Sequence, residues 1–340
     1  MTDDVIIAPQ ADSEIWRGAV AWEERDGRAR AWRLLPERAA RAHAPELVRH
    51  ATMAAGVRAL VTTDASEARL ELDFEHDADA RLDVLLDGEL YRRVEVTSGL
   101  TDLRVPLPDG EHDLAIWLPQ VGQSWVGPLT LVGASTAAPT PPAAPRWTTY
   151  GSSITQCSAA DGPSETWPAV AARALGWDLT CLGFGGQCHL DPIAASTIAA
   201  VPADVVSMCL GINIYGGATF SPRTFAAHAS AFVERVRAAH PDATLVVITP
   251  IASPARETTP NAVDFTLEQM REDLRSVVDV LQAEGDANLH LVDGLSLLGL
   301  DEVHLLPDAL HPDGEGYRLM GERVALAMGA LTGAAPATVR

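Results

Sequence analysis

The chain has 340 residues, enough for two domains, and its hydrophobic content of 47% is that of a globular protein. Its formal net charge is −21, so it would repel a phosphate backbone, and we expect no nucleic-acid partner. All basic residues are arginines, because the sequence contains no lysine. This excludes a P-loop lysine, a Schiff-base lysine and a Ser-x-x-Lys acylase.

The start of the chain, Met1–Ala8, contains neither a basic n-region nor an apolar h-region. No apolar run reaches the roughly 18 residues that a membrane span needs, so we expect a cytoplasmic protein with no membrane partner. The four cysteines lack Cys-x-x-Cys spacing, which is typical of reduced thiols in a core. The alternative is a zinc site built from Cys181, Cys188 and His189.

Residues 1–134 are expected to form an antiparallel β-sandwich or jelly roll. Apolar and polar residues alternate with period two in several runs, as strands require. These runs are Leu70/Leu72/Phe74, Leu103/Val105/Leu107 and Leu114/Ile116/Leu118. Asp87-Gly88 and Asp109-Gly110 fall between such runs, where a tight hairpin needs residues with positive φ.

Residues 135–145 are expected to form a linker between two domains. The segment is rich in small residues and contains four prolines, Pro139, Pro141, Pro142 and Pro145. Proline disrupts both central strands and helix interiors, so the composition predicts a semi-rigid connection.

Residues 146–340 have the alternating strand and helix pattern of a parallel α/β sheet. The predicted strands are Trp147–Tyr150, Leu179–Leu182, Val205–Leu210, Leu245–Ile248 and Leu289–Val292. The predicted helices are Trp167–Leu175, Ala194–Ala200, Phe225–Ala239, Leu267–Ala283 and a closing helix, Tyr317–Met328. Ligands of such sheets bind beyond the carboxyl ends of the strands.

Four short motifs follow the predicted strands in order. Ser153 ends Gly151-Ser152-Ser153, Gly186 lies in the glycine-rich segment 182–187, and Asn213 ends Leu210-Gly211-Ile212-Asn213. Asp308-Ala309-Leu310-His311 follows the last strand. A serine becomes a strong nucleophile when an imidazole removes its proton and an acid orients the imidazole. A glycine N–H and an asparagine amide can stabilise an oxyanion.

Each motif also has a structural interpretation. Gly-Ser-Ser and Asn are common in turns, and the glycine-rich segment lacks the glycine spacing of a dinucleotide site. The sequence also contains a second Asp-x-x-His, Asp301 to His304, but Pro312, Gly314 and Gly316 place His311 on a better defined loop.

Together the four motifs resemble the SGNH, or GDSL-like, hydrolase family over about residues 146–330. The resemblance implies a flavodoxin-like three-layer α/β/α fold and a Ser-His-Asp triad that needs no cofactor or metal. The resemblance implies that Ser153 is the nucleophile, that His311 is the base and that Asp308 is its orienting acid. It also implies that Gly186 and Asn213 belong to the oxyanion hole. Ser152 replaces the Asp of the family motif, which makes it a rival nucleophile.

The order of the two domains also resembles carbohydrate esterases of family two. We therefore expect a serine esterase of small acyl esters, acetyl esters above all, with an acetylated sugar as one candidate substrate. The alternatives are an acyltransferase with the same triad and a non-catalytic glycan-binding protein. Trp125 or Trp167 is a candidate sugar-stacking residue. A homo-oligomer is also compatible with the sequence.

Overall fold

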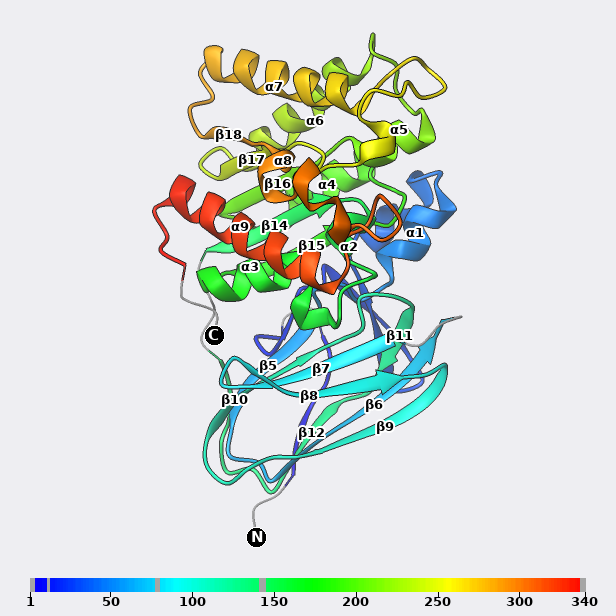
Figure 1. Ribbon diagram of the computed structural model, residues 1–340. Coiled ribbons are helices and arrows are strands. Elements are labelled where there is room, and N and C mark those ends of the chain that lie inside the picture. Colours follow the sequence, from blue (N-terminus) through cyan, green and yellow to red (C-terminus); the bar gives the residue numbers. More distant parts are fainter. Residues whose placement is uncertain (1–3, 11–12, 77–79, 141–144, 337–340) are drawn as a thin grey trace.

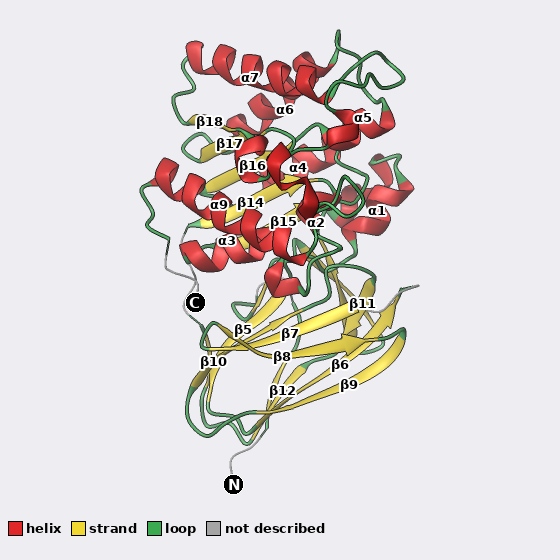
Figure 2. Ribbon diagram, in the orientation of Figure 1, coloured by secondary structure: helices red, strands yellow, loops and turns green. Residues whose placement is uncertain are grey.

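The computed structural model describes residues 4–10, 13–76, 80–140 and 145–336. It has an antiparallel β half followed by a parallel α/β half (Figures 1 and 2), which confirms the predicted fold class. Within the described ranges, no helix is both long and apolar enough to cross a bilayer.

The N-terminal half consists of two antiparallel sheets. One runs β1, β12, β6, β11, β4, β3, and β9 also pairs with β6. Its strands are Val5–Ile7, Leu129–Val132, Glu67–Glu75, Gln123–Val126, Arg28–Trp32, Ala21–Arg25 and, for β9, Gly99–Pro106. The other runs β13, β5, β10, β7, β8, and β2 also pairs with β5. Its strands are Ala137–Pro139, Arg58–Thr63, His112–Trp117, Ala80–Leu86, Glu89–Val96 and, for β2, Trp16–Arg17.

The core of this half follows from the period-two pattern. On β6, Leu70, Leu72 and Phe74 are buried, while the residues between them are partly or fully exposed. The predicted turn at Asp87-Gly88 joins β7 to β8, with φ of 52° at Asp87 and 85° at Gly88. Positive φ at both central residues is the geometry of a tight type I′ hairpin.

The linker prediction was wrong for part of residues 135–145. Ala137–Pro139 forms β13, which pairs with β5 at the edge of its sheet. An edge strand tolerates proline because one side of its backbone makes no ladder hydrogen bonds. Residues 141–144 of the predicted linker lie outside the described residues.

The C-terminal half is a parallel sheet in the order β15, β14, β16, β17, β18. The strands, in chain order, are Arg146–Gly151, Asp178–Gly183, Val205–Cys209, Thr244–Ile248 and Leu289–Val292. This is the flavodoxin-like order, in which the first strand lies between the second and third. Helices α3 and α9 pack together, and α6 packs against α4 and α7, which gives the three layers of Figure 2. These helices are Trp167–Leu175, Gly314–Thr332, Phe225–Ala239, Pro192–Ala200 and Leu267–Ala283.

The N-terminal half covers the free edge of β15. An edge strand leaves alternate backbone groups unpaired. Arg58 donates to the Leu179 carbonyl at 2.9 Å, and Arg33 donates to the carbonyls of Cys181 and Gly183 at 3.1 and 2.6 Å. Two arginines from the first half therefore satisfy three successive outward-facing carbonyls of this edge.

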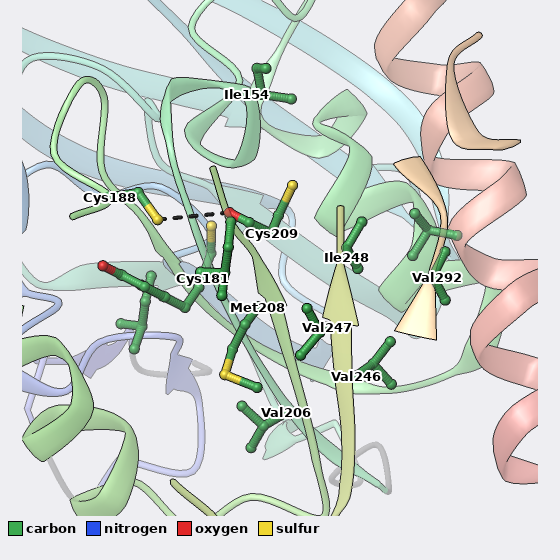
Figure 3. Packing of buried hydrophobic residues seen from close by; sticks show 14 of the residues in the cluster. Ile154, Cys181, Cys188, Val206, Met208, Cys209, Val246, Val247, Ile248 and Val292 are labelled. Atoms are coloured by element: carbon green, nitrogen blue, oxygen red, sulfur yellow. Dashed lines mark hydrogen bonds between the residues drawn. The ribbon is translucent and has the colours of Figure 1, made fainter. Parts of the chain in front are cut away.

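The four cysteines are free and buried in the core of the α/β half. Figure 3 shows Cys188 donating through its thiol to the Cys209 carbonyl, at 3.7 Å, beside the apolar side chains of β16 and β17. Burial raises the pKa of Cys209 to about 12 and raises the pKa of the other three thiols. The thiols are therefore protonated packing residues at neutral pH.

Candidate active site

The predicted site residues meet at one edge of the parallel sheet. Ser153 begins α2 (Ser153–Gln156) after β14, Gly186 follows β15, and Asn213 lies on α5 (Ile212–Gly217) after β16. These three residues and His311 line one cavity of about 420 Å³. The carboxyl ends of parallel strands lie at the same edge, which is why motifs far apart in sequence converge here.

Ser153, His311 and Asp308 form a hydrogen-bonded chain. The Ser153 Oγ lies 2.8 Å from His311 Nε2, and His311 Nδ1 lies 2.6 Å from Asp308 Oδ2. Because the Asp308 carboxylate can only accept, the neutral ring carries its proton on Nδ1, and Nε2 accepts from the serine hydroxyl. This arrangement lets the imidazole take the serine proton.

The loop that carries His311 is held in a tight turn. Asp308 Oδ1 accepts from the backbone N–H groups of Leu310 and His311, at 3.0 and 2.6 Å. Ala309 has a φ of 59°, and the Ser253 hydroxyl donates to its carbonyl at 3.0 Å. Burial raises the pKa of Asp308, but the hydrogen bonds from His311 and Leu310 outweigh burial, so this pKa lies below its usual value. Asp308 is therefore ionised at neutral pH.

The structure separates Ser153 from the rival Ser152. Ser152 is fully buried and is the N-cap of α2, where its hydroxyl accepts from the Ile154 N–H at 3.2 Å. Ser153 is the first residue of the helix, and its side chain lines the cavity. A Cβ at Gly151 would collide with the Thr155 side chain, so the tight entry into α2 requires glycine.

Gly186 has a left-handed backbone, with a φ of 69°. Its carbonyl accepts from His189 Nε2 at 3.0 Å, and His189 Nδ1 lies 2.7 Å from the Thr219 hydroxyl. Glycine adopts this φ without steric cost. His189 therefore helps to hold the Gly186 segment in place.

Asn213 is oriented by a single backbone donor. Its Oδ1 accepts from the Cys188 N–H at 3.0 Å. Since the oxygen is occupied, the NH₂ group of this cavity-lining residue remains to donate to a ligand. The amide thus has the orientation that an oxyanion donor needs.

A network from the N-terminal half also supports the site, and the sequence did not indicate it. Gln156 Oε1 accepts from the Gly185 N–H at 2.7 Å and lies 3.0 Å from His50 Nδ1. Gln156 Nε2 donates to the Gln120 carbonyl at 3.0 Å. His50 lies on α1 (Pro45–Ala51), and Figure 1 shows this helix beside the α/β half. Arg49, Met53 and Val121 from the first half also line the cavity.

Arg33 of the N-terminal half also contacts the segments around this network. Its guanidinium is fully buried and donates to the carbonyls of His50 and Met53 as well as to those of Cys181 and Gly183. Burial lowers the pKa of Arg33 to about 10, so the side chain remains charged at neutral pH. No acidic side chain pairs with it among the described residues, and backbone carbonyls compensate the charge.

Three alternatives from the sequence are not supported. Asp301 and His304 lie exposed on the 3-10 helix Leu300–Leu305, away from the lining of the cavity. Over the described part of the chain, no group of His, Cys, Asp or Glu is arranged to hold a metal ion, and His189 has both ring nitrogens in hydrogen bonds. The interpretation of Trp125 or Trp167 as a sugar-stacking residue was wrong, because both side chains are buried. Trp167 is fully buried, and the guanidiniums of Arg25 and Arg30 lie over the ring of Trp125.

Comparisons with known proteins identify the family of the chain. The model of the GDSL-like lipase/acylhydrolase family matches residues 149–319. A search of curated proteins found no match. Among solved structures, the chain is 32% identical to the salicylyl-acyltransferase SsfX3 from a tetracycline biosynthetic pathway. The match has a TM-score of 0.88 and covers 96% of this chain and 97% of that one.

Two more distant structures share the fold. A Bacteroides ovatus protein described as a GDSL-like lipase is 20% identical, with a TM-score of 0.77 and coverage of 97% of this chain and 98% of that one. A family two carbohydrate esterase from Cellvibrio japonicus is 14% identical, with a TM-score of 0.66 and the same coverage. The family model and the near full-length match together show that the chain belongs to the GDSL-like lipase/acylhydrolase family and has the SGNH-type esterase fold.

Proposed function

We propose that the protein is a serine esterase that hydrolyses esters of short acyl groups, acetyl above all. The observation that carries the proposal is the chain of hydrogen bonds from Ser153 through His311 to Asp308, at 2.8 and 2.6 Å. In a family of acylhydrolases, this is the arrangement that nucleophilic catalysis by serine requires.

The first step is attack of Ser153 Oγ on the ester carbonyl. His311 Nε2 takes the serine proton, and the ionised Asp308 stabilises the imidazolium. Three donors are available to the oxyanion: the Gly186 N–H, the Asn213 NH₂ and the N–H of Ser153. As the first residue of α2, Ser153 has no acceptor for this N–H within the helix. The imidazolium then gives its proton to the alcohol oxygen as the ester bond breaks.

The second step releases the acyl group to water. His311 takes a proton from water, whose oxygen attacks the acyl-enzyme carbonyl, and the serine leaves with that proton. The side chain of Asp308 is 54% exposed and that of His311 is 26% exposed. The partial exposure of His311 means that water can reach this base.

Acyl transfer to an alcohol or amine is the second candidate function. It is supported by the 32% identity to a salicylyl-acyltransferase over almost the whole chain. Product analysis separates the two functions, because a transferase forms little free acid until an acceptor is added. The third alternative, a glycan-binding protein without catalysis, does not account for the hydrogen bond between Ser153 and His311.

The direct test is Ser153→Ala with an aryl acetate as substrate. We expect hydrolysis to fall at least about 10³-fold, with little change in the melting temperature, because the nucleophile is lost. Ser152→Ala is the matched control. It removes a helix cap worth about 1 kcal/mol and should retain activity. Persistent activity in Ser153→Ala, or its loss in Ser152→Ala alone, would refute the assignment.

A further inference from the structure

We infer that the alcohol part of the substrate is rich in hydroxyl groups and occupies a second cavity, which adjoins that of Ser153. The inference rests on the proposed function and extends it to the substrate class. The second cavity has a volume of about 340 Å³ and lies between the two halves of the chain. Its polar lining residues are Arg81 on β7, Glu95 on β8, Gln120 and Ser158.

The two cavities share a wall. Val121 and Ser158 line both of them. Ser158 belongs to the segment that follows α2, the helix that begins with Ser153. A substrate whose ester carbonyl is at Ser153 can therefore extend past these two residues into the second cavity.

Glu95 is available to bind hydroxyl groups. It lies opposite Arg81 in the register of β7 and β8. Arg81 donates to the Asp161 carbonyl at 2.8 Å, and Glu95 forms no ion pair within the described part of the chain. A carboxylate accepts hydrogen bonds from several hydroxyl groups, and hydrogen bonds to charged groups are the stronger ones.

Gln120 belongs to the wall of the second cavity and joins the two halves there. Its side-chain NH₂ donates to the Cys157 carbonyl at 3.2 Å. The residue is only 4% exposed. This buried amide therefore links the first half to the segment after α2 and helps to fix the wall of the second cavity.

The polarity of the second cavity indicates the alcohol and not the acyl group. An apolar acyl chain would gain nothing beside the exposed side chains of Arg81 and Glu95, because their desolvation would not be compensated. A short acyl group fits within the first cavity, whose wall includes Met53, Val121 and Leu310. The remaining part of the ester, on the alcohol side, is the part that reaches the polar cavity.

The test compares two acetate esters in variants of the second cavity. One is an aryl acetate, whose leaving group has no further hydroxyl, and the other is a monoacetylated methyl glucoside. We expect Glu95→Gln to lower kcat/KM for the glucoside about 10-fold, through the loss of a charged hydrogen-bond acceptor, and to change the aryl acetate less than about 2-fold. Ala159→Phe, which fills the second cavity only, should raise KM for the glucoside alone. Glu284→Gln, exposed at the end of α7, is the matched control.

The outcomes separate this inference from the proposed function. If the native enzyme does not cleave the aryl acetate, the proposed function fails. If it cleaves the aryl acetate but neither deacetylates the glucoside nor transfers acetyl to methyl glucoside, the inference is overturned. Equal effects of Glu95→Gln on both esters, or no effect of either variant on the glucoside, also overturn it.

Discussion

Asn213 offers the sharpest test of how the site stabilises negative charge. Its oxygen is occupied by the Cys188 N–H, at 3.0 Å, so its NH₂ group is the part left for the substrate. Asn213→Ala removes this donor from the transition state. Loss of one preorganised oxyanion donor lowers kcat about 10²–10³-fold, equivalent to about 2.7–4 kcal/mol. KM should change little, because the ground-state carbonyl interacts only weakly with the amide.

The same change should cost little folding stability. Cys188 loses one neutral hydrogen bond, worth about 1 kcal/mol. The melting temperature should therefore fall by only about 2–4 °C. A large drop in kcat with a small drop in stability would show that the amide acts on the reaction itself.

Asn213→Asp is the informative companion of Asn213→Ala. It keeps an oxygen for the Cys188 N–H but replaces the donor with a negative charge, so kcat should fall at least as far as in the alanine variant. Steady-state kinetics with an aryl acetate measures both. If the aspartate variant keeps native kcat, Asn213 only orients the Cys188 segment and the donor role is refuted.

Two further predictions concern the contact between the halves. Arg33→Met removes the arginine donor from the carbonyls of Met53, Cys181 and Gly183, and should lower the free energy of unfolding by about 3 kcal/mol or more; an unchanged urea midpoint would contradict this. Burial lowers the pKa of His50, with a smaller contribution from Arg49, and the hydrogen bond to Gln156 only partly opposes this. Below a pH of about 6.5, His50 takes up a proton more readily in the unfolded chain than in the folded protein. The free energy of unfolding therefore falls on acidification. His50→Asn should lose less stability than the native protein between about pH 7 and 5 in urea unfolding, and an equal loss would count against this role.

The sequence by itself determined the fold class and the order of the site motifs. The alternation at Leu70, Leu72 and Phe74 predicted a strand with one buried face, and the structure confirms it. Ser153, Gly186 and Asn213 could be found because each follows a predicted parallel strand. Both signals are local, since side-chain periodicity and strand ends depend on neighbouring residues.

Only the tertiary structure decided how the site is completed. His50 and Gln156 lie 106 positions apart and meet because the first half covers the edge of β15. The second cavity is likewise formed by β7, β8 and the segment after α2. Ser152 and Ser153 are the same residue type, so the sequence does not distinguish them. The position at which α2 begins makes the Ser152 hydroxyl a helix cap and places the Ser153 hydroxyl beside His311. Contacts between distant segments depend on how the two halves pack, and local sequence patterns do not predict that packing.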